Sequence, residues 1–119
     1  MKRIYTYGHQ HVERNITIAD IIANKKSKVK MTQVTAQNRK EAEILSDQNI
    51  DMIITGSDTY DDVRKGAPNT FITAALFAGR FVTKDEILKG AIDVAMKGAD
   101  SVLTPVSYTH LTLPTKRIV

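Results

Sequence analysis

Hydrophobic and polar positions follow two different periods along this chain, and the changes between them divide it into segments. Short apolar or alternating runs, typical of strands, occupy residues 29–35, 51–55, 71–76 and 101–104. Capping residues followed by apolar positions at helical spacing precede each run, first at Thr17 with Asp20 and most clearly at Thr83 with Glu86. The predicted order is helix, strand, helix, strand, helix, strand, helix, strand.

Strands that alternate with helices predict βαβ units, a parallel sheet and an α/β fold. Four such strands suit half of a doubly wound fold or the N-terminal half of a (β/α)8 TIM barrel, since a whole barrel takes about 250 residues. Gly98 is predicted to end the last helix in a left-handed conformation. The buried stripe of that helix is predicted to be Ile87, Leu88, Ala91, Ile92 and Ala95.

Residues 1–15 are polar and mixed, and we interpret them as an exposed N-terminal arm before a partial barrel domain over 16–105. His9 and His11 have no carboxylate pair nearby, which argues against a metal site in the arm. The chain has no cysteine and no apolar window near the ~18 residues of a membrane span. We expect a cytoplasmic protein with no membrane partner, and a small-molecule ligand in place of nucleic acid.

The final stretch, 106–119, has a different character. Val106–Thr115 reads, in order, as one frame of a transposon-derived adapter used for sequencing libraries, with residues 116–119 as read-through. We interpret 106–119 as an adapter-derived, non-native tail, which belongs outside fold reasoning. A natural C-terminal strand is the alternative, because Val106–Leu113 alternates like one. Without Lys116 and Arg117 the formal net charge falls from +4 to +2, so the charge gives no support for nucleic acid as a partner.

Five motifs occur in a fixed order between residues 16 and 104. They are I-T-I-A-D-I-I (16–22), V-T-A (34–36), N-I-D-M-I-I-T-G (49–56), R-K-G-A-P-N (64–69) and V-A-M-K-G-A-D (94–100). This series resembles the ketopantoate hydroxymethyltransferase family, (β/α)8 barrels of the phosphoenolpyruvate mutase and isocitrate lyase superfamily. The resemblance implies transfer of a one-carbon unit from methylene-tetrahydrofolate to 3-methyl-2-oxobutanoate in pantothenate synthesis. It further implies a magnesium ion that chelates the 2-oxo acid, and a homo-oligomer for the intact parent.

The chain departs from this family at the site itself. The family's G-D-S after the second strand reads here Gly56-Ser57-Asp58, so the resemblance assigns substrate binding to Ser57 and the metal to Asp58. Ala75 stands where the family has a second carboxylate, and Leu103 and Pro105 where it has Lys and Glu-Gly-Gly. The family's general base would lie beyond this sequence, and we expect the chain alone to be inactive.

Two classes of function follow. The parent is either a divergent enzyme acting on this or another 2-oxo acid, including as a lyase or mutase, or a barrel that lost its metal and serves as a binding or regulatory subunit. Asp58 has a simpler reading as a turn or helix-cap residue.

Removal of residues 106–119 tests the interpretation of the tail. We expect the denaturant midpoint and solubility to stay unchanged, because nothing in the domain evolved to pack on an adapter. A clear loss of cooperative unfolding on truncation after Pro105 would contradict it.

Overall fold

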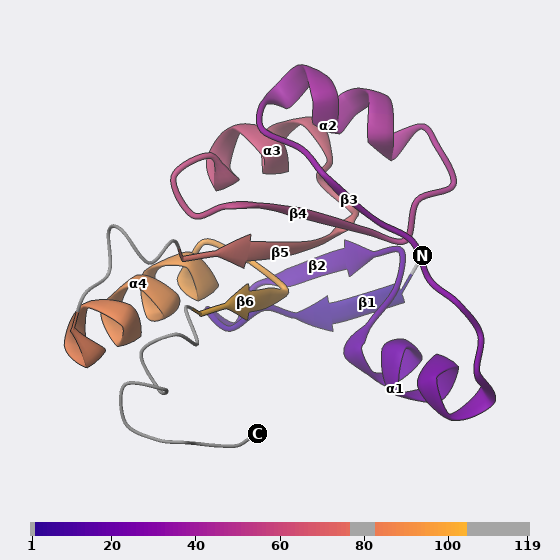
Figure 1. Ribbon diagram of the computed structural model, residues 1–119, viewed down its shortest axis with the longest axis horizontal. Coiled ribbons are helices and arrows are strands. Elements are labelled where there is room, and N and C mark those ends of the chain that lie inside the picture. Colours follow the sequence, from indigo (N-terminus) through magenta and orange to yellow (C-terminus); the bar gives the residue numbers. More distant parts are fainter. Residues whose placement is uncertain (1, 77–82, 105–119) are drawn as a thin grey trace.

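Six strands and four helices make up the computed structural model, which describes residues 2–76 and 83–104 (Figure 1). In chain order they are β1 (Lys2–Tyr5), β2 (His11–Arg14), α1 (Ile18–Ser27), β3 (Gln33–Thr35), α2 (Arg39–Ser46), β4 (Met52–Gly56), α3 (Tyr60–Gly66), β5 (Phe71–Ala75), α4 (Lys84–Met96) and β6 (Ser101–Leu103). The interpreted tail, 106–119, lies outside the described residues.

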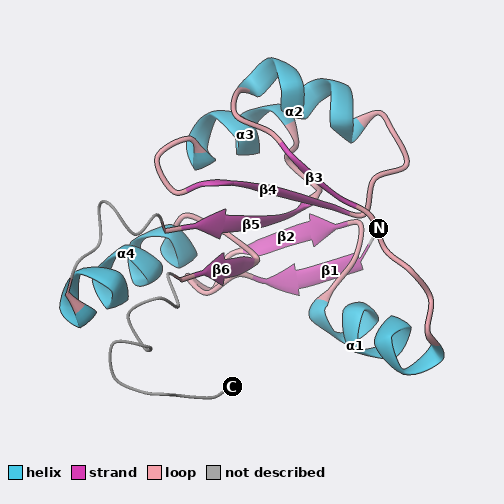
Figure 2. Ribbon diagram, viewed as in Figure 1, coloured by secondary structure: helices cyan, strands magenta, loops and turns pink. Residues whose placement is uncertain are grey.

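The central element is a parallel sheet in the order β3-β4-β5-β6 (Figure 2). One helix joins each neighbouring pair: α2 between β3 and β4, α3 between β4 and β5, and α4 between β5 and β6. The predicted α/β class and the predicted alternation of helices and strands are therefore confirmed over the described residues.

The core lies on one face of this sheet. Ile53, Ile72 and Ala74 are wholly buried there and belong to one cluster with Ala42 of α2 and Val63 of α3. Figure 1 shows α2 and α3 side by side over this face. Residues next in sequence to these strand positions point to the opposite face, because side chains alternate along a strand.

The N-terminal segment is more ordered than an arm. β1 and β2 pair as an antiparallel hairpin, with Lys2 opposite Arg14 and Tyr5 opposite His11. Most of their side chains are exposed, as expected, but Arg14 is buried at 2% exposure. Asn15 then joins the hairpin to the sheet: its side chain donates to Asp51 O and accepts from Phe71 N–H, both at 2.9 Å.

Helix starts follow the sequence closely. Thr17 with Asp20 and Thr83 with Glu86 both form complete capping boxes, and the Asn38 side chain accepts from Glu41 N–H. A hydrogen bond from Lys2, together with the Thr17 N–H, lowers the pKa of Asp20. Gly98 has the predicted left-handed backbone, with φ of 109°.

The strand predicted over 29–35 is shorter in the structure. β3 begins only at Gln33, because the two residues after α1 close the helix instead. Lys28 is left-handed, with φ of 61°, and the N–H groups of Lys28 and Val29 both bond to Asn24 O.

The predicted buried stripe of α4 is wrong: Leu88 is 61% exposed, Ile92 is 40% exposed, and Ile87, Ala91 and Ala95 are only half-buried. Val94, at 3% exposure, enters the core in their place. The spacing shows which positions share a face, but α4 is apolar on more than one side, so spacing does not identify the side that meets the sheet. The βαβ unit itself is present, because β5 and β6 pair in parallel.

Helices α2 and α3 approach most closely at Gly66. A Cβ atom at this position would lie 2.3 Å from Arg39 O and 2.9 Å from Ala42 Cβ. The backbone oxygen cannot move aside without shifting α2. We expect Gly66→Ala to lower the free energy of unfolding by about 1–3 kcal/mol, despite alanine's better helix propensity.

Urea denaturation measures this loss. Lys65→Ala is the matched control, since Lys65 is exposed in the same helix and should change stability little. Equal midpoints for Gly66→Ala and Lys65→Ala would contradict the close crossing of α2 and α3.

Candidate functional site

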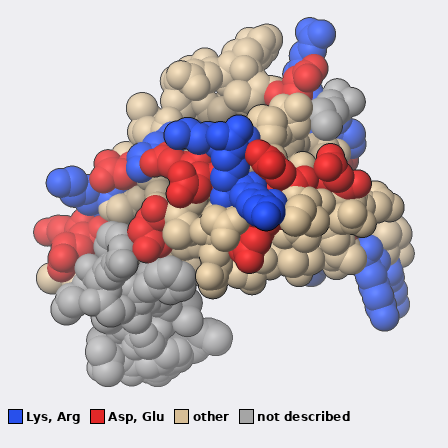
Figure 3. Space-filling view, turned by 90° about the horizontal axis from the view of Figure 1, so that it is seen from above, with Lys and Arg blue, Asp and Glu red and all other residues tan. Residues whose placement is uncertain are grey.

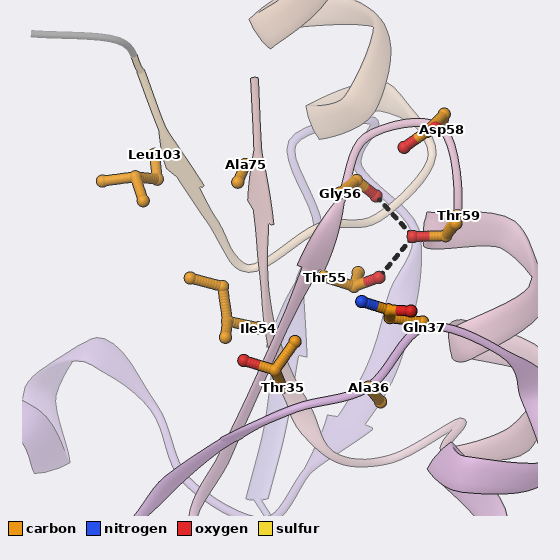
Figure 4. A pocket seen from close by; sticks show the side chains of 10 residues that line it. All are labelled: Thr35, Ala36, Gln37, Ile54, Thr55, Gly56, Asp58, Thr59, Ala75 and Leu103. Carbon is orange, nitrogen blue, oxygen red and sulfur yellow. Dashed lines mark hydrogen bonds between the residues drawn. The ribbon is translucent and has the colours of Figure 1, made fainter. Parts of the chain in front are cut away.

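A cavity of about 470 Å³ opens at the carboxyl ends of the parallel strands (Figure 4). All four strands, and the loops after β3 and β4, contribute to its lining: Thr35, Ala36, Gln37, Ile54, Thr55, Gly56, Asp58, Thr59, Ala75 and Leu103. In parallel α/β folds this end of the sheet is where ligands bind. The cavity is therefore the candidate functional site.

The floor of the cavity comes from the sheet face that points away from the core. Thr35 is paired with Ile54, and Ala75 with both Gly56 and Leu103, so these residues share one face. Ile54, Ala75 and Leu103 make the floor apolar. Leu103 is 51% exposed and Ala75 only 8%, so the cavity deepens from β6 towards β5.

One wall carries a chain of hydroxyl groups. Thr55 Oγ lies 2.6 Å from Thr59 Oγ, and Thr59 Oγ donates to Gly56 O at 3.2 Å. A hydroxyl has one proton, so Thr55 must be the donor to Thr59, and its own oxygen remains able to accept. Figure 4 shows Gln37 next to this pair, which gives the wall an amide group as well.

This hydroxyl chain replaces a predicted cap. The sequence pairs Thr59 with Asp62 as a capping arrangement, but Thr59 makes no side-chain cap hydrogen bond at the start of α3. Its hydroxyl is instead turned to the end of β4. Sequence reasoning missed Thr55, Thr59 and Gln37 as site residues. Thr35 and Thr55 stand towards the carboxyl ends of parallel strands, where ligands bind in parallel α/β folds, and this signal could have found them.

Ser57 and Asp58 lie in the turn after β4, as predicted, but they differ in position. Ser57 is half-buried, its N–H donates to Ala75 O at 2.9 Å, and it is not among the residues that line the cavity. Asp58 is exposed and lines the cavity rim (Figure 4). Of the two residues assigned by resemblance, the structure places the acidic one at the site.

The lining does not fit a resident magnesium ion. Mg²⁺ requires near-octahedral oxygen ligands and gives up its water reluctantly. Among the lining residues that the structure describes, Asp58 is the one carboxylate, and Ala75 and Leu103 are apolar. Within the described part of the chain, no three His, Asp or Glu side chains lie close enough together to hold a metal ion.

The opposite ends of the strands carry a buried ionic cluster, which we call the arginine–aspartate cluster: Arg14, Arg64 and Asp100. Arg14 Nε lies 2.8 Å from both carboxylate oxygens of Asp100, and Arg64 Nη2 lies 3.0 Å from Oδ2. The side chains are 3%, 16% and 4% exposed for Arg14, Arg64 and Asp100. The Ile72 N–H also donates to Asp100, at 3.0 Å.

The guanidinium groups of this cluster also bind backbone. Both arginines donate to Gly98 O, and Arg64 donates to Thr70 O at 2.7 Å and to the Tyr60 hydroxyl at 2.9 Å. The cluster thus connects the hairpin, α3, the start of β5 and the turn before β6. The charged groups of the cluster bond to other groups of the protein, so we assign the cluster a structural role. The cavity lies at the opposite end of the sheet.

Charge on the surface is mixed. Figure 3, seen from above in the view of Figure 1, shows Lys and Arg interleaved with Asp and Glu in one band. None of the helices in residues 2–76 and 83–104 combines the length and apolarity needed to cross a membrane.

A scan against protein-family models and a search of curated proteins each find no match for this chain.

Asp100→Asn tests the structural role of the arginine–aspartate cluster. The substitution keeps the shape of the side chain but leaves two largely buried guanidinium groups without their counter-charge. We expect a loss of about 3–5 kcal/mol in the free energy of unfolding, measured by urea denaturation at neutral pH.

Asp61→Asn is the matched control. Asp61 pairs with Lys97 at 3.3 Å, but both side chains are about half exposed or more, at 62% and 48%. Its removal should cost about 0–1 kcal/mol. Similar losses for the two variants would show that burial of the cluster contributes nothing.

Proposed function

We propose that this chain is the N-terminal half of a TIM barrel related to ketopantoate hydroxymethyltransferase, and that its cavity binds a small 2-oxo acid. The reaction class is transfer of a one-carbon unit from methylene-tetrahydrofolate to 3-methyl-2-oxobutanoate. In the parent protein the general base and the folate site would come from later strands.

One observation carries this proposal. By motif order, Ser57 stands at the family's metal-binding Asp, with Asp58 directly after it, while Ala75 and Leu103 stand at a second carboxylate and a lysine. Asp58, Ala75 and Leu103 line the same cavity. The carboxyl ends of neighbouring parallel strands lie together, so this meeting supports the strand order that the resemblance implies.

The motifs themselves also acquire a physical reason. Arg64 of R-K-G-A-P-N and Asp100 of K-G-A-D form an ion pair in the arginine–aspartate cluster. Gly66 of the same motif permits the close crossing of α2 and α3. In a barrel, residues at the amino-terminal face contribute to stability and not to catalysis. These motifs therefore support the proposed scaffold, and the proposed reaction belongs to the cavity.

The cavity has the two surfaces that a branched 2-oxo acid needs. The apolar floor of Ile54, Ala75 and Leu103 can cover the isopropyl group of 3-methyl-2-oxobutanoate. The Gln37 amide can donate a hydrogen bond to its carboxylate or keto oxygen, whereas the Thr59 proton is already donated to Gly56 O.

Ala75 and Leu103 favour a second candidate function. Apolar residues stand here at two of the family's polar positions. Such a cavity suits a barrel that still binds its ligand but has lost its metal site, and that serves as a binding or regulatory subunit. The two candidates share the same ligand site and differ in whether the parent turns the ligand over.

Titration of the 119-residue chain with 3-methyl-2-oxobutanoate tests the site, followed by ¹H–¹⁵N NMR. We expect millimolar binding, with shift changes concentrated at Gln37, Thr55 and Thr59. Gln37→Leu should weaken binding several-fold, because it removes the amide donor of the wall.

Pyruvate is the matched control ligand, since it keeps the 2-oxo acid group and lacks the branch that would cover the apolar floor. It should bind more weakly. Shift changes spread evenly over the chain, or no difference between the two acids, would count against this cavity as the site.

A gain-of-function variant tests the correspondence with the family. Ala75→Asp returns a second carboxylate to the cavity next to the turn that holds Asp58. We expect the natural chain to show no magnesium-dependent thermal shift at millimolar concentration, and Ala75→Asp to show one.

Thr73→Asp is the control for this variant. Thr73 lies on the same face of β5 as Ala75, but two residues further from the carboxyl end of the strand. It should not create magnesium dependence. A magnesium response in the natural chain would overturn our conclusion that the lining does not fit the ion.

A further inference from the structure

The hydroxyl groups in the wall of the cavity form hydrogen bonds in one fixed direction. Gly56 O accepts from both the backbone N–H and the hydroxyl of Thr59, at 3.2 Å in each case. The Thr59 proton is therefore used within the turn after β4. Thr55 Oγ lies 2.6 Å from Thr59 Oγ and must supply the proton of the hydrogen bond between them.

Burial of Thr55 keeps this order from reversing. Thr55 is 2% exposed, and among the described residues the Thr59 hydroxyl is the one hydrogen-bond partner of its hydroxyl. If Thr59 donated to Thr55 instead, the Thr55 proton would remain in the interior without an acceptor, which is unfavourable. Both protons of the Thr55–Thr59 pair are thus donated to oxygens of the protein.

The pair can therefore offer a ligand only lone pairs of electrons. A hydroxyl oxygen has two lone pairs, and Thr59 Oγ uses one of them to accept from Thr55. Thr59 is half-buried and lines the cavity, so its second lone pair is within reach of a ligand. Figure 4 shows the two hydroxyl groups turned towards each other, with Gln37 beside them. This part of the wall can accept a hydrogen bond from a ligand but cannot donate one.

Gln37 differs from the pair because its amide has both N–H donors and a carbonyl acceptor. It can bind the carboxylate or the keto oxygen of a 2-oxo acid, and both of these are acceptors only. Neither of them finds a donor at Thr59. A hydroxyl group on the ligand does carry a proton, and Thr59 Oγ is the acceptor that it requires.

We propose that Thr59 determines specificity in the cavity: its Oγ accepts a hydrogen bond from a hydroxyl group of the ligand, so that 2-oxo acids with a hydroxyl group bind better than those without one. Thr55 is a positioning residue, because its proton keeps the Thr59 oxygen in the accepting role. This inference rests on the proposed function, since it takes the 2-oxo acid group to be bound elsewhere in the same cavity.

Hydroxypyruvate and pyruvate form a matched pair of probes, because they differ by a single hydroxyl group. Each is titrated into the 119-residue chain and followed by ¹H–¹⁵N NMR. We expect hydroxypyruvate to bind about threefold to tenfold more tightly, the gain typical of one additional hydrogen bond.

The outcomes of this comparison separate the two proposals. If pyruvate binds at the cavity as tightly as hydroxypyruvate, or more tightly, the assignment of Thr59 is overturned and the proposed function stands. If neither acid changes the shifts of the cavity residues, both proposals are overturned. The comparison is made on the natural chain and does not depend on how a variant folds.

Thr59→Val removes the acceptor and keeps the shape of the side chain. The Thr55 proton then has no acceptor in the protein and becomes available to the ligand, so the wall changes from acceptor to donor. Hydroxypyruvate should bind several-fold more weakly, while pyruvate should bind as before or more tightly. An equal loss for both acids is the result expected of a purely structural residue, and it would contradict the proposal.

Thr59→Ser is the matched control, because it keeps the hydroxyl group and removes only the methyl group. It should retain the preference for hydroxypyruvate. Circular dichroism and the urea midpoint verify that both variants fold. A serine variant that loses the preference as the valine variant does would show that the Thr59 oxygen is not the determinant.

Discussion

The structure depends on one buried carboxylate. Asp100 binds Arg14 from the hairpin and Arg64 from α3, and it also accepts the N–H of Ile72 at the second residue of β5. Burial of an ion pair is costly unless the geometry is good and the remaining donors are satisfied. Here each guanidinium also donates to backbone carbonyls that end or begin strands and helices. The three charged side chains therefore hold four segments together at the amino ends of the sheet: the hairpin, α3, the start of β5 and the turn before β6.

This arrangement places the ionic contacts and the cavity at opposite ends of one sheet. The amino ends carry the ionic cluster and Asn15, whose side chain bonds to Asp51 O just before β4 and to the Phe71 N–H at the start of β5. The carboxyl ends carry short polar side chains around an open cavity. The cavity lining, Ala75 included, is therefore remote from the ionic contacts that hold the segments together.

Local sequence rules predicted most of the fold. The capping boxes at Thr17 and Thr83 and the left-handed Gly98 depend on neighbouring residues, and all three were confirmed. What failed depends on contacts distant in sequence. The buried side of α4 is selected by its fit to the sheet, and Arg14 is buried by a partner 86 residues away. For the site, the turn at Asp58 and the start of α3 after Thr59 were predictable from the residues, whereas the Thr55–Thr59 hydrogen bond required knowing that the Thr59 hydroxyl turns to β4 instead of capping α3.

The position of Asp100 also has a consequence for biosynthesis. Arg14 and Arg64 leave the ribosome well before the carboxylate that neutralises them, and 36 residues separate Arg64 from Asp100. At about 5–20 residues per second, this interval lasts about 2–7 s. During that time the hairpin and α3 can form locally, but their guanidinium groups remain hydrated, and the amino ends of the sheet cannot close. Until Asp100 has emerged, the ionic contacts that join these segments cannot form.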